Sequence, residues 1–147
     1  MTAKLFDINN RDLKLNENLI VEASAGTGKT YTIENLAVRL LIEPDPIPIE
    51  QLLIVTFTRA ATRDLRLRIR HRILESIRSL ETKELPLPDY LSYVIEKGEE
   101  ELRRALLLLK KALSSIDQAQ IFTIHGFCNR ALQEFSVESG VTNLQMR

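Results

Sequence analysis

Ala23-Ser24-Ala25-Gly26-Thr27-Gly28-Lys29-Thr30 is the stretch of this sequence that decides the fold. It matches the phosphate-loop pattern G-x-x-x-x-G-K-[ST] at every fixed position except the first, where alanine replaces glycine. Gly26 and Gly28 let backbone amides turn inward around an anion. Lys29 can reach the terminal phosphates as a mobile positive charge, and Thr30 offers a hydroxyl to Mg²⁺. We therefore predict that residues 23–30 bind the phosphates of a nucleotide. The alternative is a glycine-containing turn that only joins a strand to a helix.

The segments on either side of this loop alternate between strand and helix patterns. The short apolar run 19–21 predicts a buried strand before the loop. Three prolines between 44 and 48 end the helix that follows the loop, so the helix is expected over 29–42. The continuously apolar run 52–57 predicts a central strand covered on both faces. Five residues form the expected apolar face of the first helix: Ile33, Leu36, Ala37, Leu40 and Leu41.

The second half of the chain continues the alternation. A long helix is expected over 60–80, and two shorter helices, over 90–97 and 100–114, form a helical insert. A third strand is expected over 121–124, followed by a turn at His125-Gly126 and a last helix from Phe127. The long helix has one apolar stripe: Ala61, Leu65, Ile69, Ile73, Ile77 and Leu80. This order predicts an α/β fold, a parallel sheet with helical crossovers.

Composition excludes several classes of protein. The 147 residues are 44% hydrophobic and 27% charged, with zero net charge, which argues against a disordered tail. A single cysteine forms no intramolecular disulfide, so a reducing compartment is expected. We see neither a signal peptide nor an apolar run long enough to cross a bilayer. A cytoplasmic protein without membrane partners is the expectation.

The neutral total hides two oppositely charged segments. Residues 59–78 carry seven arginines against Asp64 and Glu75, and 7 − 2 gives +5. Residues 79–101 carry seven acids against Lys83 and Lys97, and 2 − 7 gives −5. In one alternative the arginines bind nucleic acid, and Arg66 and Arg70 would each contact a phosphate. In the other, the acidic segment 79–101 neutralises the arginines. The sequence leaves these alternatives open.

Hydrolysis of a nucleotide needs more than a phosphate loop. An acid must hold Mg²⁺ and another group must place the attacking water, commonly from an apolar strand that ends in Asp-Glu. The dipeptide Asp-Glu does not occur in this chain. We therefore expect the chain to supply half of an ATPase and, alone, to be inactive.

Three blocks of this sequence resemble the superfamily 1 helicases of the UvrD/RecB type. They are VEASAGTGKTYTI at 21–33, LLIVTFTRAATRDLRLRIR at 52–70 and IFTIHGFCNRAL at 121–132. Members of that family commonly begin the phosphate loop with alanine, as Ala23 does here. The blocks look most like those of the branch formed by the beta subunits of exodeoxyribonuclease V. The resemblance implies a P-loop NTPase fold of the RecA-like kind, here a partial motor domain plus a helical insert.

Roles of individual residues follow from the resemblance. ATP and Mg²⁺ would bind at residues 23–30, with Lys29 and Thr30 as the catalytic pair and the Thr30 hydroxyl on the metal. The block after the second strand touches single-stranded DNA in the family, and so does the third-strand block. The residues expected at the DNA are therefore Thr56, Phe57, Thr58, Thr123, His125 and Phe127. No role transfers to Arg59, a position at which relatives vary.

The resemblance also implies an organisation and partners. Residues 1–85 would begin the ATP-binding motor domain, 86–115 would start an accessory subdomain, and 116–147 would return to the motor domain. In the complete protein, gamma and alpha subunits of exodeoxyribonuclease V would be partners. That enzyme unwinds and degrades broken duplex DNA, and its nuclease residues lie outside this chain. The glutamine that contacts adenine in many relatives is not evident before the loop.

Other interpretations stay open at this point. Phe57 ends an apolar strand and, without the resemblance, would be a core residue. His125 would be a structural histidine that bonds a carbonyl. The chain could also be a stand-alone phosphate-loop module that binds nucleotide or DNA without turnover, or a small kinase or GTPase.

Overall fold

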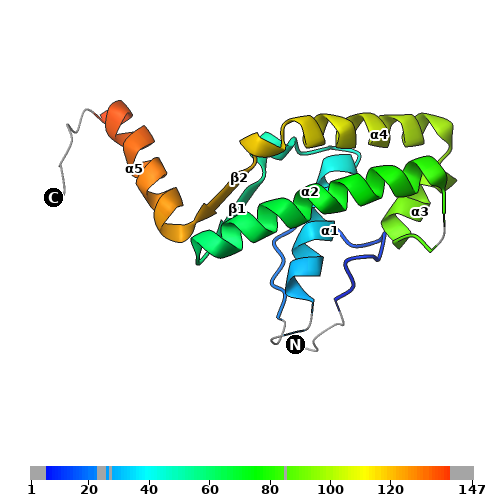
Figure 1. The fold of residues 1–147 in the computed structure, drawn as a ribbon, viewed down its shortest axis with the longest axis horizontal. Coiled ribbons are helices and arrows are strands. Elements are labelled where there is room, and N and C mark those ends of the chain that lie inside the picture. The colour runs from blue at the N-terminus through cyan, green and yellow to red at the C-terminus, as the bar shows by residue number, and fades with distance from the viewer. Residues whose placement is uncertain (1–5, 23–25, 27, 85, 140–147) are drawn as a thin grey trace.

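The computed structural model describes residues 6–22, 26, 28–84 and 86–139, the last four by their backbone alone. Helix α2 runs through the middle of the molecule, α4 lies along it, and α5 projects from the end of the sheet (Figure 1). The elements in chain order are α1 (Lys29–Ile42), the 3₁₀ helix η1 (Ile49–Gln51), β1 (Leu53–Thr56), α2 (Arg59–Thr82), α3 (Asp89–Glu96), α4 (Glu99–Ser114), the 3₁₀ helix η2 (Ile116–Gln118), β2 (Gln120–Thr123) and α5 (Ile124–Ser139).

Strands β1 and β2 form a parallel pair. Leu53 lies opposite Gln120, and Thr56 lies opposite Thr123 at the carboxyl ends. The chain returns from one strand to the other through α2, α3 and α4, because parallel neighbours need a long crossover. This confirms the expected α/β class with a helical crossover. The sheet of the described residues has two strands, so it is not a full RecA-like sheet.

The strand expected at 19–21 does not form. Ile20 is 95% exposed, and this run pairs with neither β1 nor β2 in the described part of the chain. A strand needs ladder hydrogen bonds on an edge and cover on at least one face. This apolar run has neither, so it remains irregular.

The strand expected at 52–57 forms as β1, but its two faces differ. Ile54 packs against the hydrophobic core, whereas Leu53 and Val55 are 46% and 42% exposed. Helix α2 contacts β1, and alternate side chains of a strand point to opposite faces. The expectation of cover on both faces is therefore wrong for the described residues.

Helix α2 forms because a capped start precedes a regular apolar stripe. The Thr58 side chain accepts a 3.0 Å hydrogen bond from the backbone N–H of Ala61, the arrangement of an N-cap. Lys83, at φ 55°, ends the helix in the left-handed conformation. The expected stripe is confirmed except at Ala61, which is exposed. Its buried members are Leu65, Ile69, Ile73, Ile77 and Leu80.

Helix α1 has the bounds that the sequence predicts, but its buried face matches the expected one only in part. Ala37 and Leu41 of the expected apolar face are buried. Ile33 is 37% exposed, whereas Glu34, Asn35 and Arg39 are buried. Each of these polar side chains has partners: Asn35, for example, accepts a 2.7 Å hydrogen bond from the hydroxyl of Tyr90 on α3. Partners of this kind remove the penalty for burying polar groups, so these three residues lie in the interior beside the apolar ones.

Helices α3 and α4 lie where the sequence predicts an insert, with Gly98 between them at φ 103°. Three glutamates open α4, where the helix dipole favours negative charge. Both helices bury apolar residues in the same core cluster as α1 and α2. The division of the chain into 1–85, 86–115 and 116–147 stays a prediction.

Helix α5 begins directly after β2, at Ile124. The turn expected at His125-Gly126 is therefore wrong, because these residues form the first turn of the helix. Thr123 makes this abrupt start possible, since its hydroxyl accepts a 3.1 Å hydrogen bond from the backbone N–H of Gly126. None of the helices within the described ranges is both long and apolar enough to span a membrane.

Candidate nucleotide-binding and nucleic-acid interface

The described part of the phosphate loop has the backbone that its glycines predict. Gly26 and Gly28 lie at φ 80° and 86°, in the left-handed region that glycine adopts without strain. A Cβ at Gly26 would meet no atom within 4 Å, so conformation rather than space requires glycine there. Four residues of the predicted loop lie outside the described residues: Ala23, Ser24, Ala25 and Thr27.

Lys29 and Thr30 open helix α1 directly after Gly28, and both are exposed. No described side chain caps this helix start, and no acid lies in its first turn. The first amides of a helix have no partner within it, and they carry the positive end of the helix dipole. This uncapped start, with a lysine and a hydroxyl beside it, suits a phosphate group.

The residues present fit Mg²⁺ only in part. The hydroxyl of Thr30 at the start of α1 is of the type that holds Mg²⁺ in phosphate-loop proteins. Within the described ranges, no three His, Cys, Asp or Glu side chains gather into a metal site. The metal would therefore depend on the nucleotide's own phosphates and on groups other than such a cluster.

A second group of predicted site residues meets at the carboxyl ends of β1 and β2. The parallel register sets Thr56 beside Thr123. The Thr56 hydroxyl lies 2.7 Å from the hydroxyl of Thr62 on α2 and donates to the Phe122 carbonyl at 3.4 Å. Segments that are more than 60 residues apart in sequence therefore form one edge. The structure brings together the two blocks that were predicted to touch DNA.

Phe57 projects from this edge and is 86% exposed. The alternative that Phe57 is a core residue is therefore wrong. It lies between Thr56, which ends β1, and Thr58, which caps α2, so ordered backbone holds it on both sides. An exposed aromatic ring on a rigid mount is the kind of group on which nucleic-acid bases stack.

His125 and Phe127 lie in the first turn of α5, next to the same edge. His125 is exposed and has no hydrogen-bond partner among the described residues, which does not fit the structural alternative of a carbonyl bond. Phe127 is half-buried. Arg130, one turn further, lies with its guanidinium 5.3 Å from the centre of the Phe122 ring. Cationic and aromatic groups thus continue along α5.

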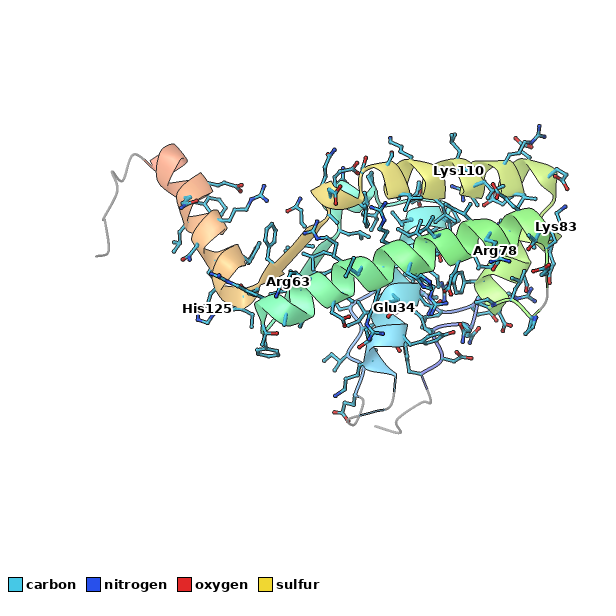
Figure 2. All side chains as sticks on the ribbon, viewed as in Figure 1. Glu34, Arg63, Arg78, Lys83, Lys110 and His125 are labelled. Atoms are coloured by element: carbon cyan, nitrogen blue, oxygen red, sulfur yellow. The ribbon has the colours of Figure 1, made fainter. Side chains whose placement is uncertain are left out.

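The sequence predicts no role for two arginines at this edge. Arg59 and Arg63 line a depression with Thr123 and Gly126, and they form no ion pair with any described residue. Arg63 and His125 lie at the same end of the molecule (Figure 2). Arg59 and Arg63 are four residues apart at the start of the helix that follows the strand. This spacing is a sequence signal that could have identified the two arginines.

The remaining arginines of α2 have structural partners. Arg66 donates to the backbone carbonyls of Ile116, Asp117 and Ala119 at 3.0–3.3 Å, so the alternative that it meets a phosphate is wrong. Arg68 pairs with Asp64 at 2.7 Å. Arg72 pairs with Glu34 at 3.5 Å and with Glu75 at 2.9 Å. Among the described residues Arg70 makes no ion pair.

The acidic segment 79–101 does not neutralise these arginines. Its described acids pair elsewhere: Glu81 with Lys110, Glu99 with Lys83, and Glu101 with Arg104. The hydrogen bond from Lys83 lowers the pKa of Glu99, and that from Arg104 lowers the pKa of Glu101. Among the described residues, Arg59 and Arg63 at the start of α2 therefore have no acidic partner.

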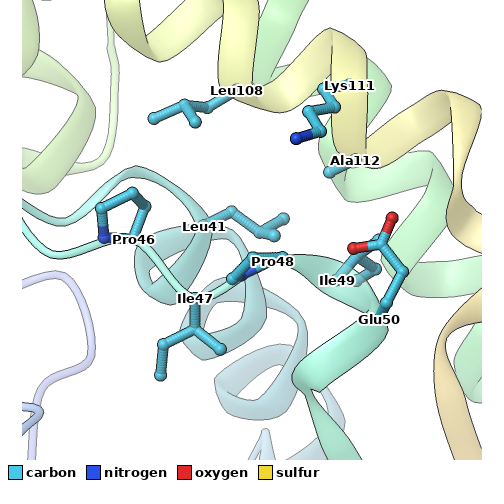
Figure 3. A pocket seen from close by; sticks show the side chains of 9 residues that line it. All are labelled: Leu41, Pro46, Ile47, Pro48, Ile49, Glu50, Leu108, Lys111 and Ala112. Carbon is cyan, nitrogen blue, oxygen red and sulfur yellow. The ribbon is translucent and has the colours of Figure 1, made fainter.

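An apolar hollow elsewhere in the molecule is not a nucleotide site. It lies between the connection 46–50 and α4, with Leu108 and Ala112 on one wall (Figure 3). Its volume is about 50 Å³, far below the 300–1,000 Å³ that small-molecule sites occupy. It is a packing imperfection beside the core.

Comparison with known proteins supplies the family. Residues 7–146 match the UvrD/REP helicase N-terminal domain. RecBCD enzyme subunit RecB of Escherichia coli (strain K12) is 45% identical over 138 residues, which is 88% of this chain and 11% of that protein. The RecB subunit of Haemophilus influenzae is 36% identical over 152 residues, 95% of this chain and 12% of that protein.

The chain therefore spans about an eighth of the length of these relatives, and it resembles their N-terminal helicase region. Because the family model covers nearly the whole chain, the sequence motifs and the comparison agree. This chain belongs to the UvrD/REP helicase N-terminal domain family.

Proposed function

We propose that this chain is the ATP-binding N-terminal part of a DNA helicase subunit that unwinds and degrades broken duplex DNA for recombinational repair. The observation that carries the proposal is the start of α1. Two glycines at positive φ lead into an uncapped helix that begins with Lys29 and Thr30, in a chain of a helicase family.

ATP binds through residues 23–30 in this proposal. Lys29 neutralises the terminal phosphates as they gain charge, and the free amides at the start of α1 donate to the same oxygens. Thr30 holds Mg²⁺ through its hydroxyl. Hydrolysis needs further acids, which we assign to parts of the protein outside this chain.

Single-stranded DNA binds across the edge formed by Thr56, Phe57, Thr58, Thr123, His125 and Phe127. A base stacks on the exposed Phe57 ring, and the backbone phosphates lie over the positive start of α2. Arg59 and Arg63 add charge there, since no described acid pairs with them. Contacts of this kind are independent of base sequence.

Helix α1 and helix α2 link the two sites. Glu34, five residues after Lys29 on α1, is 6% exposed and pairs with Arg68 and Arg72 of α2. If α1 shifts when nucleotide binds, these ion pairs would transmit the movement to α2, whose first residues lie at the DNA edge. This linkage gives the motor a direct physical connection between ATP and DNA.

The relatives are named as subunits of the RecBCD enzyme. We propose that the complete protein assembles with gamma and alpha subunits of exodeoxyribonuclease V. Its nuclease would lie in the part of the protein beyond this chain.

Lys29→Ala in the complete protein tests the proposal. We expect loss of ATP hydrolysis and unwinding with folding intact, because Lys29 is exposed and has no described partner. A variant that unwinds DNA at the wild-type rate would overturn the assignment. Nucleotide binding without any turnover in the wild-type protein would favour a stand-alone phosphate-loop module instead.

A further inference from the structure

A row of arginines and leucines follows the exposed side of helix α2. Its members are three or four residues apart, which places them above one another on one face of a helix. The two leucines are 66% and 44% exposed. We call these five residues the exposed row: Arg63, Leu67, Arg70, Leu74 and Arg78.

The three arginines of the exposed row carry charge that the described residues do not neutralise. All three are exposed, and none forms a hydrogen bond or an ion pair within the part of the chain that the structure describes. The acids of the same helix already pair with other cations: Asp64 with Arg68, Glu75 with Arg72 and Glu81 with Lys110.

Stability of the folded chain gives no reason for this row. Arg59 opposes the helix dipole in the first turn of α2, and Arg63 places a like charge one turn later. Leu67 and Leu74 lie outside the hydrophobic core that the other side of the helix joins. Arginines that follow one face of a helix are instead the electrostatic footprint of a nucleic-acid surface.

The exposed row begins at the proposed DNA edge. Arg63 lines the same depression as Thr123 and Gly126. Arg63 and Arg78 lie near the two ends of α2 (Figure 2). At 1.5 Å per residue the row extends for about 22 Å, with its arginines about 10 to 12 Å apart along the axis. A strand that crosses the edge can therefore continue along α2 and meet further cations.

We infer that the exposed row is a path for single-stranded DNA that continues from the proposed DNA edge. The three arginines bind backbone phosphates, and the two leucines pack against sugars and unstacked bases between them. A duplex keeps the faces of its bases inside the stack, so exposed leucines suit a single strand better than a duplex. The inference rests on the proposed function of the DNA edge.

The test is a salt titration of single-strand binding by the complete protein, with Arg70 and Arg78 both replaced by alanine. Each phosphate contact contributes about 0.7 to the slope of log affinity against log salt concentration, so this double variant should lose about 1.4 of slope. Leu67→Ala should lower the affinity about threefold at every salt concentration, because an apolar contact releases no counterions. Melting temperatures should stay at the wild-type value, since all three side chains are exposed.

Helix α4 supplies matched controls. Arg103 is exposed, and within the described structure it donates only to the carbonyl of Glu99 on its own helix, at 3.2 Å. Leu107 is 70% exposed, close to the 66% of Leu67. Arg103→Ala and Leu107→Ala should keep the wild-type slope and affinity. A loss of slope in Arg103→Ala equal to that per arginine in the double variant would assign the effect to net charge and overturn the path.

An unchanged slope in the folded double variant would overturn the inference, and equally so if that variant loses a protein partner instead. A slope that falls on duplex DNA but not on a single strand would overturn the choice of a single strand. Phe57→Ala separates this inference from the proposed function. Wild-type single-strand affinity in Phe57→Ala overturns the DNA edge itself. Reduced affinity there, together with a wild-type slope in the double variant, overturns only the path along α2.

Discussion

The hydroxyl of Thr123 lies 3.1 Å from the backbone nitrogen of Gly126, and a Cβ built on Gly126 would lie 3.1 Å from the same oxygen. One atom therefore both caps helix α5 and occupies the space that a larger residue would need. Thr58 caps α2 in the same manner, through Ala61 three residues later. Both helices at the proposed DNA edge start on a threonine at the end of a strand or just after it: Thr123 is the last residue of β2, and Thr58 lies two residues after β1.

Removing the Thr123 hydroxyl should destabilise the start of α5. We expect Thr123→Ala to lower the free energy of unfolding by about 1 kcal/mol, the usual effect of losing an N-cap. Thr123→Ser keeps the acceptor and should stay within a few tenths of a kcal/mol of wild type. Hydrogen exchange of the first amides of α5 reports this locally, and equal exchange in the two variants would contradict the capping role.

The close approach of Thr123 to Gly126 predicts that the two positions are not independent. In a helix, alanine is favoured over glycine by about 1 kcal/mol, but in the wild type the added methyl presses on the capping oxygen. Gly126→Ala should therefore gain little alone and about 1 kcal/mol in the Thr123→Ala background. A double-mutant cycle by denaturant unfolding measures this coupling, and additive effects would show that the contact is unimportant.

Phe57 should matter for DNA and not for folding. Because its ring is 86% exposed, Phe57→Ala should leave the melting temperature unchanged. Its affinity for single-stranded DNA should fall by about 1–3 kcal/mol, the contribution of a stacked base. Leu107→Ala on α4, at an apolar residue that is 70% exposed, serves as the control and should leave DNA binding intact. Loss of DNA affinity in both variants would contradict a specific stacking role.

Arg63 and Arg66, one turn apart on α2, should behave in opposite ways. Arg63 has no described ion-pair partner, so Arg63→Ala should reduce the salt dependence of single-strand binding by about 0.7 in slope, with stability unchanged. Arg66 holds three carbonyls around η2, so Arg66→Ala should lower stability and leave the slope unchanged. The salt titration is decisive, and a smaller slope in Arg66→Ala would contradict the structural assignment.

The sequence predicted best the elements that local signals delimit. Helix α1 has the predicted bounds, because glycine precedes it and three prolines follow it. The buried stripe of α2 also follows from spacing alone, since a long amphipathic helix has one face to bury. That Thr56 lies beside Thr123 could be predicted from the sequence only by assuming that their two strands pair in parallel, as they do.

What failed depends on partners that are distant in the chain. Arg39 of α1 is buried because it binds carbonyls that lie 26 to 31 residues earlier, which no periodicity reveals. The run 19–21 and one face of β1 have the apolar sequence of buried strands, yet the described residues leave them exposed. Arg63 looked like any other arginine of the basic segment until the structure showed which arginines already have partners.

Glu101 and Arg104 predict an acid-sensitive contact between α4 and α1. Arg104 donates to both carboxylate oxygens of Glu101, at 3.0 and 2.7 Å, and also to the Ile42 carbonyl at the end of α1. Hydrogen bonding to Arg104 lowers the pKa of Glu101 below its ordinary 4.5. A carboxyl whose pKa is lower in the folded state stabilises the fold above the unfolded pKa. That contribution is lost as the pH falls through the lower folded pKa.

We therefore expect stability to decline below about pH 4.5 through this pair, by at most about 1 kcal/mol, because the pair is partly exposed. Glu101→Gln should remove this contribution at neutral pH and flatten the acid limb of the stability curve. Glu100→Gln, its exposed neighbour on the same turn, is the control and should keep the wild-type curve. Denaturant unfolding between pH 3 and 7 makes the comparison, and parallel curves for Glu101→Gln and wild type would show that other carboxylates cause the acid sensitivity.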